Sequence, residues 1–339
     1  MRILLSSNHR YPGAGTFSSG MAPREFPSGS GFIIHDLLAK GLAEMGHQVF
    51  YLLPRGAEQP LPPGVTLLHE PMFEVDIVHT ITFRDHDLVC AMRKAGVPWV
   101  ATCHLDPTVP GRTIPGPIED NWIFVSGSLA RSLGKTRHVL SGIDPADYLF
   151  GEIPDDYFLF MASLEWAGHK GLGIALQLAT RHNFRLVVAG TGKSRKIIEQ
   201  TADVCRAAGA EYVGDVRGVE KARLLARARA LLFPTQVNEA FGLVMAEALF
   251  SGTPVIASAN GSCPEIVTPD VGFICRSERD YCNALHQVER ISRASCRKLA
   301  LQRFHYLRMV EDYVREYQNE IASEANSRAM AEHVSGEQP

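Results

Sequence analysis

The feature of this sequence that most constrains its fold is the alternation of short β-branched, apolar runs with segments of helical periodicity. Parallel sheets whose strands are joined by crossover helices produce this alternation. Strands are expected at residues 2–6, 48–53, 65–69, 76–79, 97–103, 122–125, 157–161, 185–189, 230–234, 254–257 and 271–274. Helices are expected at residues 32–45, 172–180, 193–207, 221–229, 242–250 and 301–321.

Chain length and a break in this pattern indicate two domains. The 339 residues are about twice the size of a usual single domain. A segment rich in turn formers, residues 141–156, separates two series of alternating elements. We therefore predict an α/β protein with two Rossmann-like domains, residues 1–147 and 148–302, facing each other across a cleft. A helix at 303–322 follows, and the polar residues 323–339 are expected to be a disordered tail.

Composition narrows the functional classes. The 34 basic and 37 acidic residues give a net charge of −3, so no general field favours nucleic acid or an anionic membrane. The seven cysteines contain no C-x-x-C pair, which leaves a disulfide framework and a structural zinc site unsupported and suits a reducing cytoplasm. No run approaches the roughly 18 apolar residues of a spanning helix, so we expect neither an export signal nor a transmembrane anchor.

Two familiar nucleotide-binding motifs fail on spacing. Gly29 and Gly31 lack the third glycine of the dinucleotide fingerprint, because position 34 is isoleucine. The sequence Gly192-Lys193-Ser194 resembles the end of a P-loop, but the first glycine of that loop would be at position 187, which is valine.

Asp85-His86-Asp87 spells a D-x-D metal motif, yet it opens a helix, where aspartate is favoured anyway. We predict no metal site.

The strongest constellation of residues lies between positions 234 and 255. An apolar strand ends at Pro234, a polar loop carries Glu239, and a helix begins near Gly242. The unpaired N–H groups at the start of such a helix bind anions. Glu247 follows on the first turns of the same helix, where its carboxylate can accept hydrogen bonds from a pair of sugar hydroxyls.

The spacing of Glu239 and Glu247 resembles the E-x(7)-E motif of the family 4 retaining glycosyltransferases, which have the GT-B fold. Residues 251–257 (Ser-Gly-Thr-Pro-Val-Ile-Ala) and 261–267 (Gly-Ser-Cys-Pro-Glu-Ile-Val) are similar to the elements that follow this motif in the family. Less specific matches at 76–79, 101–104, 169–171 and 187–190 extend the resemblance from residue 1 to about residue 322.

The resemblance implies roles for individual residues. Three are expected at the reaction: Glu239 holds sugar hydroxyls and the developing positive charge, Lys170 holds the donor diphosphate, and His104 lies beside the reacting sugar. Glu247 is expected to bind the ribose. The full set of donor contacts that we expect is Gly29, Gly31, Lys170, Gly190, Gly214, Val216, Phe241, Gly242, Leu243 and Glu247.

One position departs from the family pattern. The family usually has an arginine a few residues before the lysine, in a G-R-L segment, and Ser163 occupies the corresponding position here. Arg24 and Lys193 are the cations that we consider as its replacement.

These observations predict a metal-independent, cytoplasmic, retaining glycosyltransferase, with a hexose as the expected sugar. It would take a nucleotide diphosphate sugar and an acceptor, bind no other cofactor, and return its last helix to the first domain. Two alternatives remain. One is a nucleotide-sugar 2-epimerase, which also uses two Rossmann-like domains, and the other is a non-enzymatic nucleotide-sugar binding protein.

Overall fold

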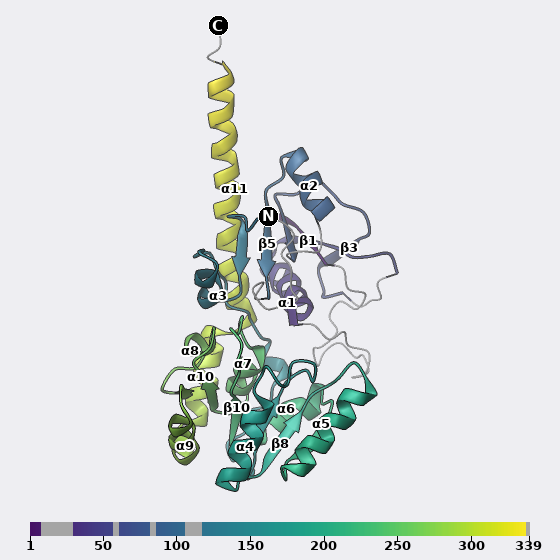
Figure 1. The fold of residues 1–339 in the computed structure, drawn as a ribbon. Helices are drawn as coiled ribbons and strands as arrows, with labels where there is room; N and C mark the ends of the chain where they lie inside the picture. Colours follow the sequence, from purple (N-terminus) through teal and green to yellow (C-terminus); the bar gives the residue numbers. More distant parts are fainter. Residues whose placement is uncertain (8–29, 57–60, 82–85, 106–116, 337–339) are drawn as a thin grey trace. The chain divides into compact units, whose positions relative to one another are not determined.

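The computed structural model describes residues 1–7, 30–56, 61–81, 86–105 and 117–336. The chain divides into two compact units (Figure 1). Described residues up to Gly142, together with those from Tyr306 onward, form the first unit, and Ile143–His305 belong to the second. The predicted domain boundaries fell after residues 147 and 302.

The first unit contains a six-stranded parallel sheet in the order β3-β2-β1-β4-β5-β6. Ile3 at its centre pairs with Val49 on one side and Ile77 on the other. The central strands are buried along almost their whole length, as expected for a parallel sheet covered on both faces. The strands are β1 (Arg2–Ser6), β2 (Gln48–Leu52), β3 (Val65–Leu68), β4 (Ile77–Ile81), β5 (Trp99–Cys103) and β6 (Trp122–Phe124). The helices are α1 (Ser30–Glu44), α2 (His86–Ala95), α3 (Gly127–Ser132) and α11 (Tyr306–Gly336).

The second unit repeats this topology with the order β12-β11-β10-β7-β8-β9. Its strands are β7 (Phe158–Met161), β8 (Leu186–Ala189), β9 (Glu211–Gly214), β10 (Ala230–Phe233), β11 (Val255–Ser258) and β12 (Gly272–Cys275). Its helices are α4 (Leu172–His182), α5 (Arg195–Ala207), α6 (Gly218–Arg227), α7 (Leu243–Phe250), α8 (Cys263–Ile266), α9 (Glu278–Gln287) and α10 (Arg293–Arg303), with 3-10 turns η3 (Pro145–Asp147) and η4 (Val288–Arg290).

Strand β9 was not predicted from the sequence. It lies at one edge of the second sheet, and its residues alternate between exposed and partly buried. Glu211 and Val213 are exposed, so this strand has no continuous apolar run. The prediction relied on such runs, which are typical of strands buried on both faces.

Helix α11 packs its apolar stripe on the first unit. Met309, Val310, Tyr313 and Tyr317 are buried. A β-carbon added at Gly41 of α1 would lie 2.5 Å from Val310 Cγ2, so this glycine permits close contact between the two helices. The helix continues to Gly336, over residues for which the sequence had indicated a disordered tail.

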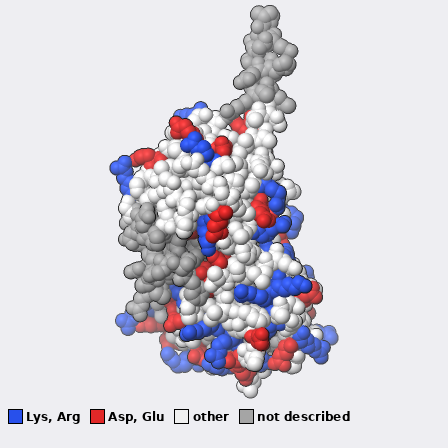
Figure 2. All heavy atoms as spheres, turned by 180° about the vertical axis from the view of Figure 1, so that it is seen from behind, with Lys and Arg blue, Asp and Glu red and all other residues white. Residues whose placement is uncertain are grey.

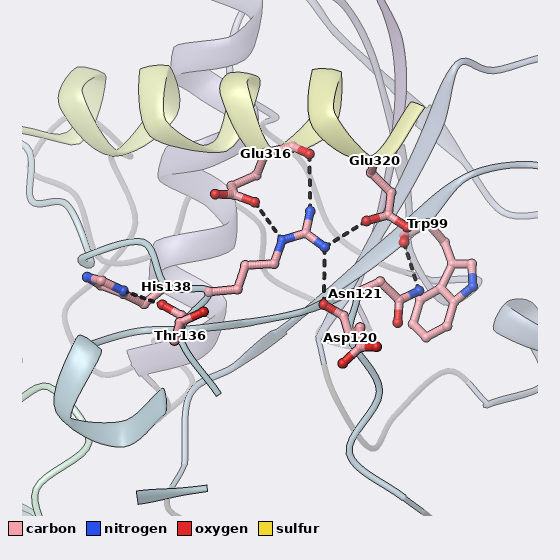
Figure 3. A network of polar contacts seen from close by, with 8 residues as sticks. Trp99, Asp120, Asn121, Thr136, His138, Glu316 and Glu320 are labelled. Carbon is pink, nitrogen blue, oxygen red and sulfur yellow. Dashed lines mark hydrogen bonds and ion pairs between the residues drawn. The ribbon is translucent and has the colours of Figure 1, made fainter. Parts of the chain in front are cut away.

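A partly buried arginine network holds the middle of α11 (Figure 3). Arg137 Nε donates to Glu316 Oε2 at 2.5 Å, and Arg137 Nη1 donates to Glu320 Oε2 at 2.7 Å. The same guanidinium also donates to the carbonyls of Glu316 at 3.1 Å and Asp120 at 3.3 Å. One side chain therefore joins the segment after β6 to successive turns of the helix, in the charge-assisted geometry that arginine favours.

Surface charge is mixed on the face drawn in Figure 2. Lysine and arginine side chains lie among aspartate and glutamate there, and neither sign covers a broad area of the described surface in that view. Within the described residues, every helix is either too short or too polar to cross a bilayer.

Candidate active site

The loop between β10 and α7 carries Glu239 at the carboxyl end of the second sheet. Its backbone is held by the segment that follows β11. Ser262 N–H donates to the Glu239 carbonyl at 2.9 Å, and Ser262 Oγ donates to the Phe241 carbonyl at 2.8 Å. Gly261 has a left-handed φ of +59°, and a β-carbon there would lie 2.2 Å from Glu239 N. Only glycine fits this contact, which fixes the position of Glu239.

Lys170 forms an ion pair with Glu239. The carboxylate of Glu239 is largely buried, and 22% of the Lys170 side chain is exposed. Lys170 comes from the loop between β7 and α4, and the next residue, Gly171, has a left-handed φ of +85°. A β-carbon at Gly171 would lie 2.0 Å from the Pro234 carbonyl, so this glycine lets the lysine loop approach the end of β10. The two charges predicted for the site are thus brought together.

The start of α7 lies directly after Glu239. Gly242 is its N-cap residue, with φ +80° and no side-chain capping bond, and Leu243 is its first helical residue. The first N–H groups of a helix have no partner within the helix, so this end carries partial positive charge. Phe241 is buried, and its ring packs edge-on against Phe304 with centroids 6.0 Å apart. Phe241 can therefore contact a ligand only through its backbone.

Glu247 is buried one turn further along α7 and has two partners that the sequence analysis missed. Tyr148 donates its hydroxyl to Glu247 Oε1 at 2.9 Å. Lys221 Nζ lies 2.7 Å from both carboxylate oxygens. Lys221 had been placed only within a helix, and Tyr148 only in the turn-rich segment between the domains, so neither carried a signal for the site.

The ends of β8 and β9 meet next to each other. Gly190 N–H donates to the Gly214 carbonyl at 2.9 Å, and the Tyr212 hydroxyl donates to the Gly190 carbonyl at 2.8 Å. Gly214 has a left-handed φ of +80°, and Val216 follows it in a partly exposed loop. The three residues expected at the donor from this part of the chain therefore lie on adjoining strand ends.

Comparison with known proteins finds similarity in the second unit. Residues 152–300 match the family described as glycosyl transferases group 1. An uncharacterized glycosyltransferase of Methanocaldococcus jannaschii is 35% identical over 102 residues, which are 29% of this chain and 25% of that protein. The chain thus matches a quarter of that relative's length.

Solved structures resemble the chain over almost its whole length. AviGT4, a glycosyltransferase involved in avilamycin A biosynthesis, is 24% identical with a TM-score of 0.71, covering 95% of this chain and 98% of that one. HepE of Anabaena, solved in complex with UDP-glucose, is 15% identical with a TM-score of 0.67, covering 96% and 100%. At these identities the likeness shows the fold, which is the predicted GT-B fold of two Rossmann-like domains.

In the second unit, a small polar cluster occupies the position where the resemblance expected an arginine. Ser163 donates its hydroxyl to Glu165 Oε2 at 2.7 Å, and the Lys193 backbone N–H donates to Glu165 Oε1. This N–H is the main cause of a lowered pKa of Glu165, with Ser163 contributing next. The Lys193 side chain is exposed, and Arg24 lies outside the described residues. Glu165 was not anticipated from the sequence.

In the first unit, Gly31 and His104 are neighbours. A β-carbon at Gly31 would lie 3.1 Å from His104 Cδ2, so the backbone at the start of α1 packs closely on the imidazole that follows β5. Gly29 lies outside the described residues. His79 is fully buried inside β4 and hydrogen-bonds to Tyr317 and Thr102, each at 2.6 Å. His79 therefore has a packing role in the interior of the first unit.

Two further features concern the thiol and carboxylate groups of the described residues. Cys263 is buried near Glu239, and burial followed by the Glu239 charge raises the pKa of its thiol to about 12. The thiol therefore stays protonated at neutral pH and is a poor nucleophile. Among the described residues, no group of three or more His, Cys, Asp or Glu side chains has the arrangement of a metal site. Of the D-x-D pair, Asp87 lies in the first turn of α2 and Asp85 is outside the described residues.

Proposed function

We propose that this protein transfers a sugar, most simply a hexose, from a nucleotide diphosphate sugar to an acceptor, with retention of configuration at the anomeric carbon. The observation that supports this proposal is the Lys170–Glu239 ion pair beside the uncapped start of α7. This arrangement offers positive charge for a leaving diphosphate and a carboxylate for a sugar that becomes positively charged as its bond to phosphate breaks.

The leaving group would be stabilised by two features of the second unit. An ammonium has three donors, so Lys170 can bond to Glu239 and to a phosphate oxygen at the same time. The N–H groups at the start of α7 supply further donors to the diphosphate. Charge that builds on the leaving phosphate is then met by fixed groups, the arrangement that lowers a barrier most effectively. We therefore propose that no metal is required for this step.

Glu239 would act on the sugar. Its backbone is held by Gly261 and Ser262 and its carboxylate by Lys170, so it can accept hydrogen bonds from sugar hydroxyls without reorienting. Its negative charge also favours the positive charge of an oxocarbenium-like transition state. In a retaining transfer the acceptor attacks on the face from which the diphosphate leaves. As the resemblance implies, we assign a contact with the reacting sugar to His104 and a contact with the donor diphosphate to Gly31.

Nucleotide-sugar turnover tests the proposal. The first step is a thermal-shift screen against UDP, GDP, ADP and dTDP, since a ligand that binds only the folded protein raises its melting temperature. The second is turnover of the matching nucleotide hexoses, with and without EDTA, and NMR of the product anomer. We expect an acceptor-dependent product with retained configuration and no loss in EDTA. An inverted product, or activity that EDTA abolishes and Mn²⁺ restores, would contradict it.

Matched variants locate the activity. Lys170→Met should lower turnover, whereas Lys196→Met, which removes an exposed lysine on α5, should leave it unchanged.

A non-enzymatic role is the second candidate, because Ser163 and the Glu165 carboxylate occupy the place where the resemblance expected a diphosphate-binding cation. Nucleotide binding without turnover over a broad panel of acceptors would favour that role. Release of an epimerised sugar in the absence of any acceptor would instead favour a 2-epimerase.

A further inference from the structure

The buried carboxylate of Glu247 is held by side chains from two distant segments of the chain. Tyr148 lies 99 residues before it in sequence, in the segment that opens the second unit. Lys221 lies 26 residues before it, on α6. Tyr148 donates to Oε1, and Lys221 lies 2.7 Å from both oxygens. The orientation of the carboxylate plane is therefore fixed from two sides.

Tyr148 is itself held in place. It is the C-cap residue of η3, whose N-cap Asp144 accepts a hydrogen bond from the Ala146 N–H at 2.9 Å. The Tyr148 ring stacks on Phe250 at the end of α7, with centroids 6.4 Å apart and planes at 28°. The Lys221 ammonium lies 6.0 Å from the centre of the same ring. The hydroxyl is thus directed at Glu247 by packing on the helix that carries Glu247.

The Tyr148 hydroxyl remains a donor at neutral pH. Burial, followed by the nearby Glu247 carboxylate, raises the pKa of Tyr148 well above its usual value. A carboxylate has about four lone-pair positions, and Tyr148 and Lys221 occupy only part of this capacity. The remaining positions can accept hydrogen bonds from a ligand.

We propose that Tyr148 and Lys221 are positioning residues that fix the Glu247 carboxylate for a pair of ribose hydroxyls and thereby make the site selective for ribonucleotides over deoxyribonucleotides. This inference rests on the proposed function, a transfer from a nucleotide diphosphate sugar, and on the role that the resemblance implies for Glu247, which is to bind the ribose of that donor. The physical basis of the selectivity is that a fixed, buried acceptor left without its hydroxyl partner is costly. An acceptor that can reorient toward water or another donor discriminates less.

The test measures a ratio of affinities. The ligand is whichever of UDP, GDP and ADP gives the largest thermal shift, compared by calorimetry with its 2′-deoxy and 3′-deoxy counterparts. For the unmodified protein we expect the ribonucleotide to bind about tenfold more tightly, corresponding to one lost hydrogen bond. In Tyr148→Phe and in Lys221→Met the ratio should fall to about twofold or less. The donor KM should rise while kcat changes little, because the contact is made equally before and during reaction.

Control variants separate positioning from general destabilisation. Tyr157→Phe removes a hydroxyl that donates to the Leu224 carbonyl of α6, elsewhere in the same unit, and should keep the tenfold ratio. Lys221→Arg retains the positive charge and should restore part of the ratio that Lys221→Met loses. Melting temperatures identify any variant that does not fold. Because Tyr148→Phe and Lys221→Met each test the proposal, one of them can fail to fold and the other still provides the test.

The experiment distinguishes failure of the ribose role of Glu247 from failure of the positioning role of Tyr148 and Lys221. If Glu247→Ala keeps the full tenfold ratio, the ribose role expected of Glu247 is wrong and the inference falls with it. The same follows if none of the three nucleotides binds. If Glu247→Ala loses the ratio while folded Tyr148→Phe and Lys221→Met keep it, Glu247 binds ribose unaided and only the positioning role is overturned.

Discussion

The two units share one strand order and use the ends of their strands differently. Numbered from the first strand of each unit, both sheets run 3-2-1-4-5-6. In the first, the polar side chains His79 and Thr102 lie inside central strands and bond to tyrosines of α11. In the second, Lys170 and Glu239 lie in loops beyond the strands. The same strand order therefore holds polar packing contacts inside the first sheet and presents an ion pair beyond the strand ends of the second, where we propose that the donor binds. Function depends on such residues placed on the scaffold.

Removing α11 should have the largest effect and should act on the first unit alone. A chain ending at His305 leaves α10 complete but exposes the surface that Tyr313 and Tyr317 cover and removes two partners of the His79 network. Several large buried aromatics at about 3–5 kcal/mol each exceed the margin of most domains. We expect the first unit to lose cooperative thermal unfolding and turnover to disappear.

The matched control is a chain ending at Ser323. Residues 323–327 are exposed or only partly buried, so this truncation should change stability by no more than about 0.5 kcal/mol. A stable, active protein ending at His305 would show that α11 is dispensable to the first unit.

Glu239→Gln should have the next largest effect and should act on catalysis. The change keeps the shape of the side chain and removes the charge that pairs with Lys170 and faces the proposed sugar. We expect kcat to fall by about 10² to 10³, the usual loss when one electrostatic contact to a transition state is removed. Steady-state kinetics with a nucleotide hexose measure this. Glu220→Gln, at an exposed position of α6, is the control and should be neutral. A rise in donor KM alone would assign Glu239 to ground-state binding.

The sequence predicted the fold of both units better than the details of the site. Buried strands such as β4 and β10 were found because parallel sheets covered on both faces need uninterrupted apolar runs. The edge strand β9 has no such run and was missed. Glu239 and Glu247 were found because they lie on one short loop and helix, where spacing in sequence determines spacing in the structure.

The partners of these carboxylates were harder to find. Lys170 was predicted as a site residue, but from its resemblance to a family motif and not from its ion pair. Tyr148 is joined to Glu247 across 99 residues, and no local pattern encodes such a contact. The contact of Gly261 with the Glu239 backbone also depends on how two loops meet after the sheet has formed.

Gly261→Ala should have an intermediate effect, on stability and activity together. Its left-handed φ is unfavourable for alanine, and the added methyl would lie 2.2 Å and 2.3 Å from the backbone N and O of Glu239. We expect a loss of roughly 2–4 kcal/mol in unfolding free energy and a lower kcat, because the loop must move. Gly209→Ala is the control: its φ of +72° is similar, but its added methyl meets nothing within 4 Å. That variant should cost roughly 1–2 kcal/mol and leave kcat unchanged. If both variants lost the same unfolding free energy, the Glu239 loop would have moved away from the added methyl at little energetic cost.

The smallest expected effect is a pH dependence of stability that belongs to the first unit. Burial is the main cause of a pKa of His79 well below its usual value, and the nearby His35, His104 and Arg137 lower it further. His79 also lies against Tyr313 and Tyr317 of α11. The unfolded chain binds a proton at this imidazole below a pH of about 6.5, whereas the folded protein does not. Stability should therefore be complete above that pH and decline as the pH falls, by at most about 1.4 kcal/mol per pH unit.

Urea unfolding of the first unit between pH 8 and pH 5.5 measures this dependence. His79→Gln cannot take up the proton in either state, so its stability should be lower at neutral pH but should change less with acidification. His138→Gln, at an exposed histidine of the same unit, should keep the full dependence. Since His79 is bonded to α11 through Tyr317, the loss should appear as earlier exposure of that helix in hydrogen exchange. If acid destabilised His79→Gln as much as the unmodified protein, the group responsible for the pH dependence would not be His79. The pH dependence would then not distinguish the first sheet from the second.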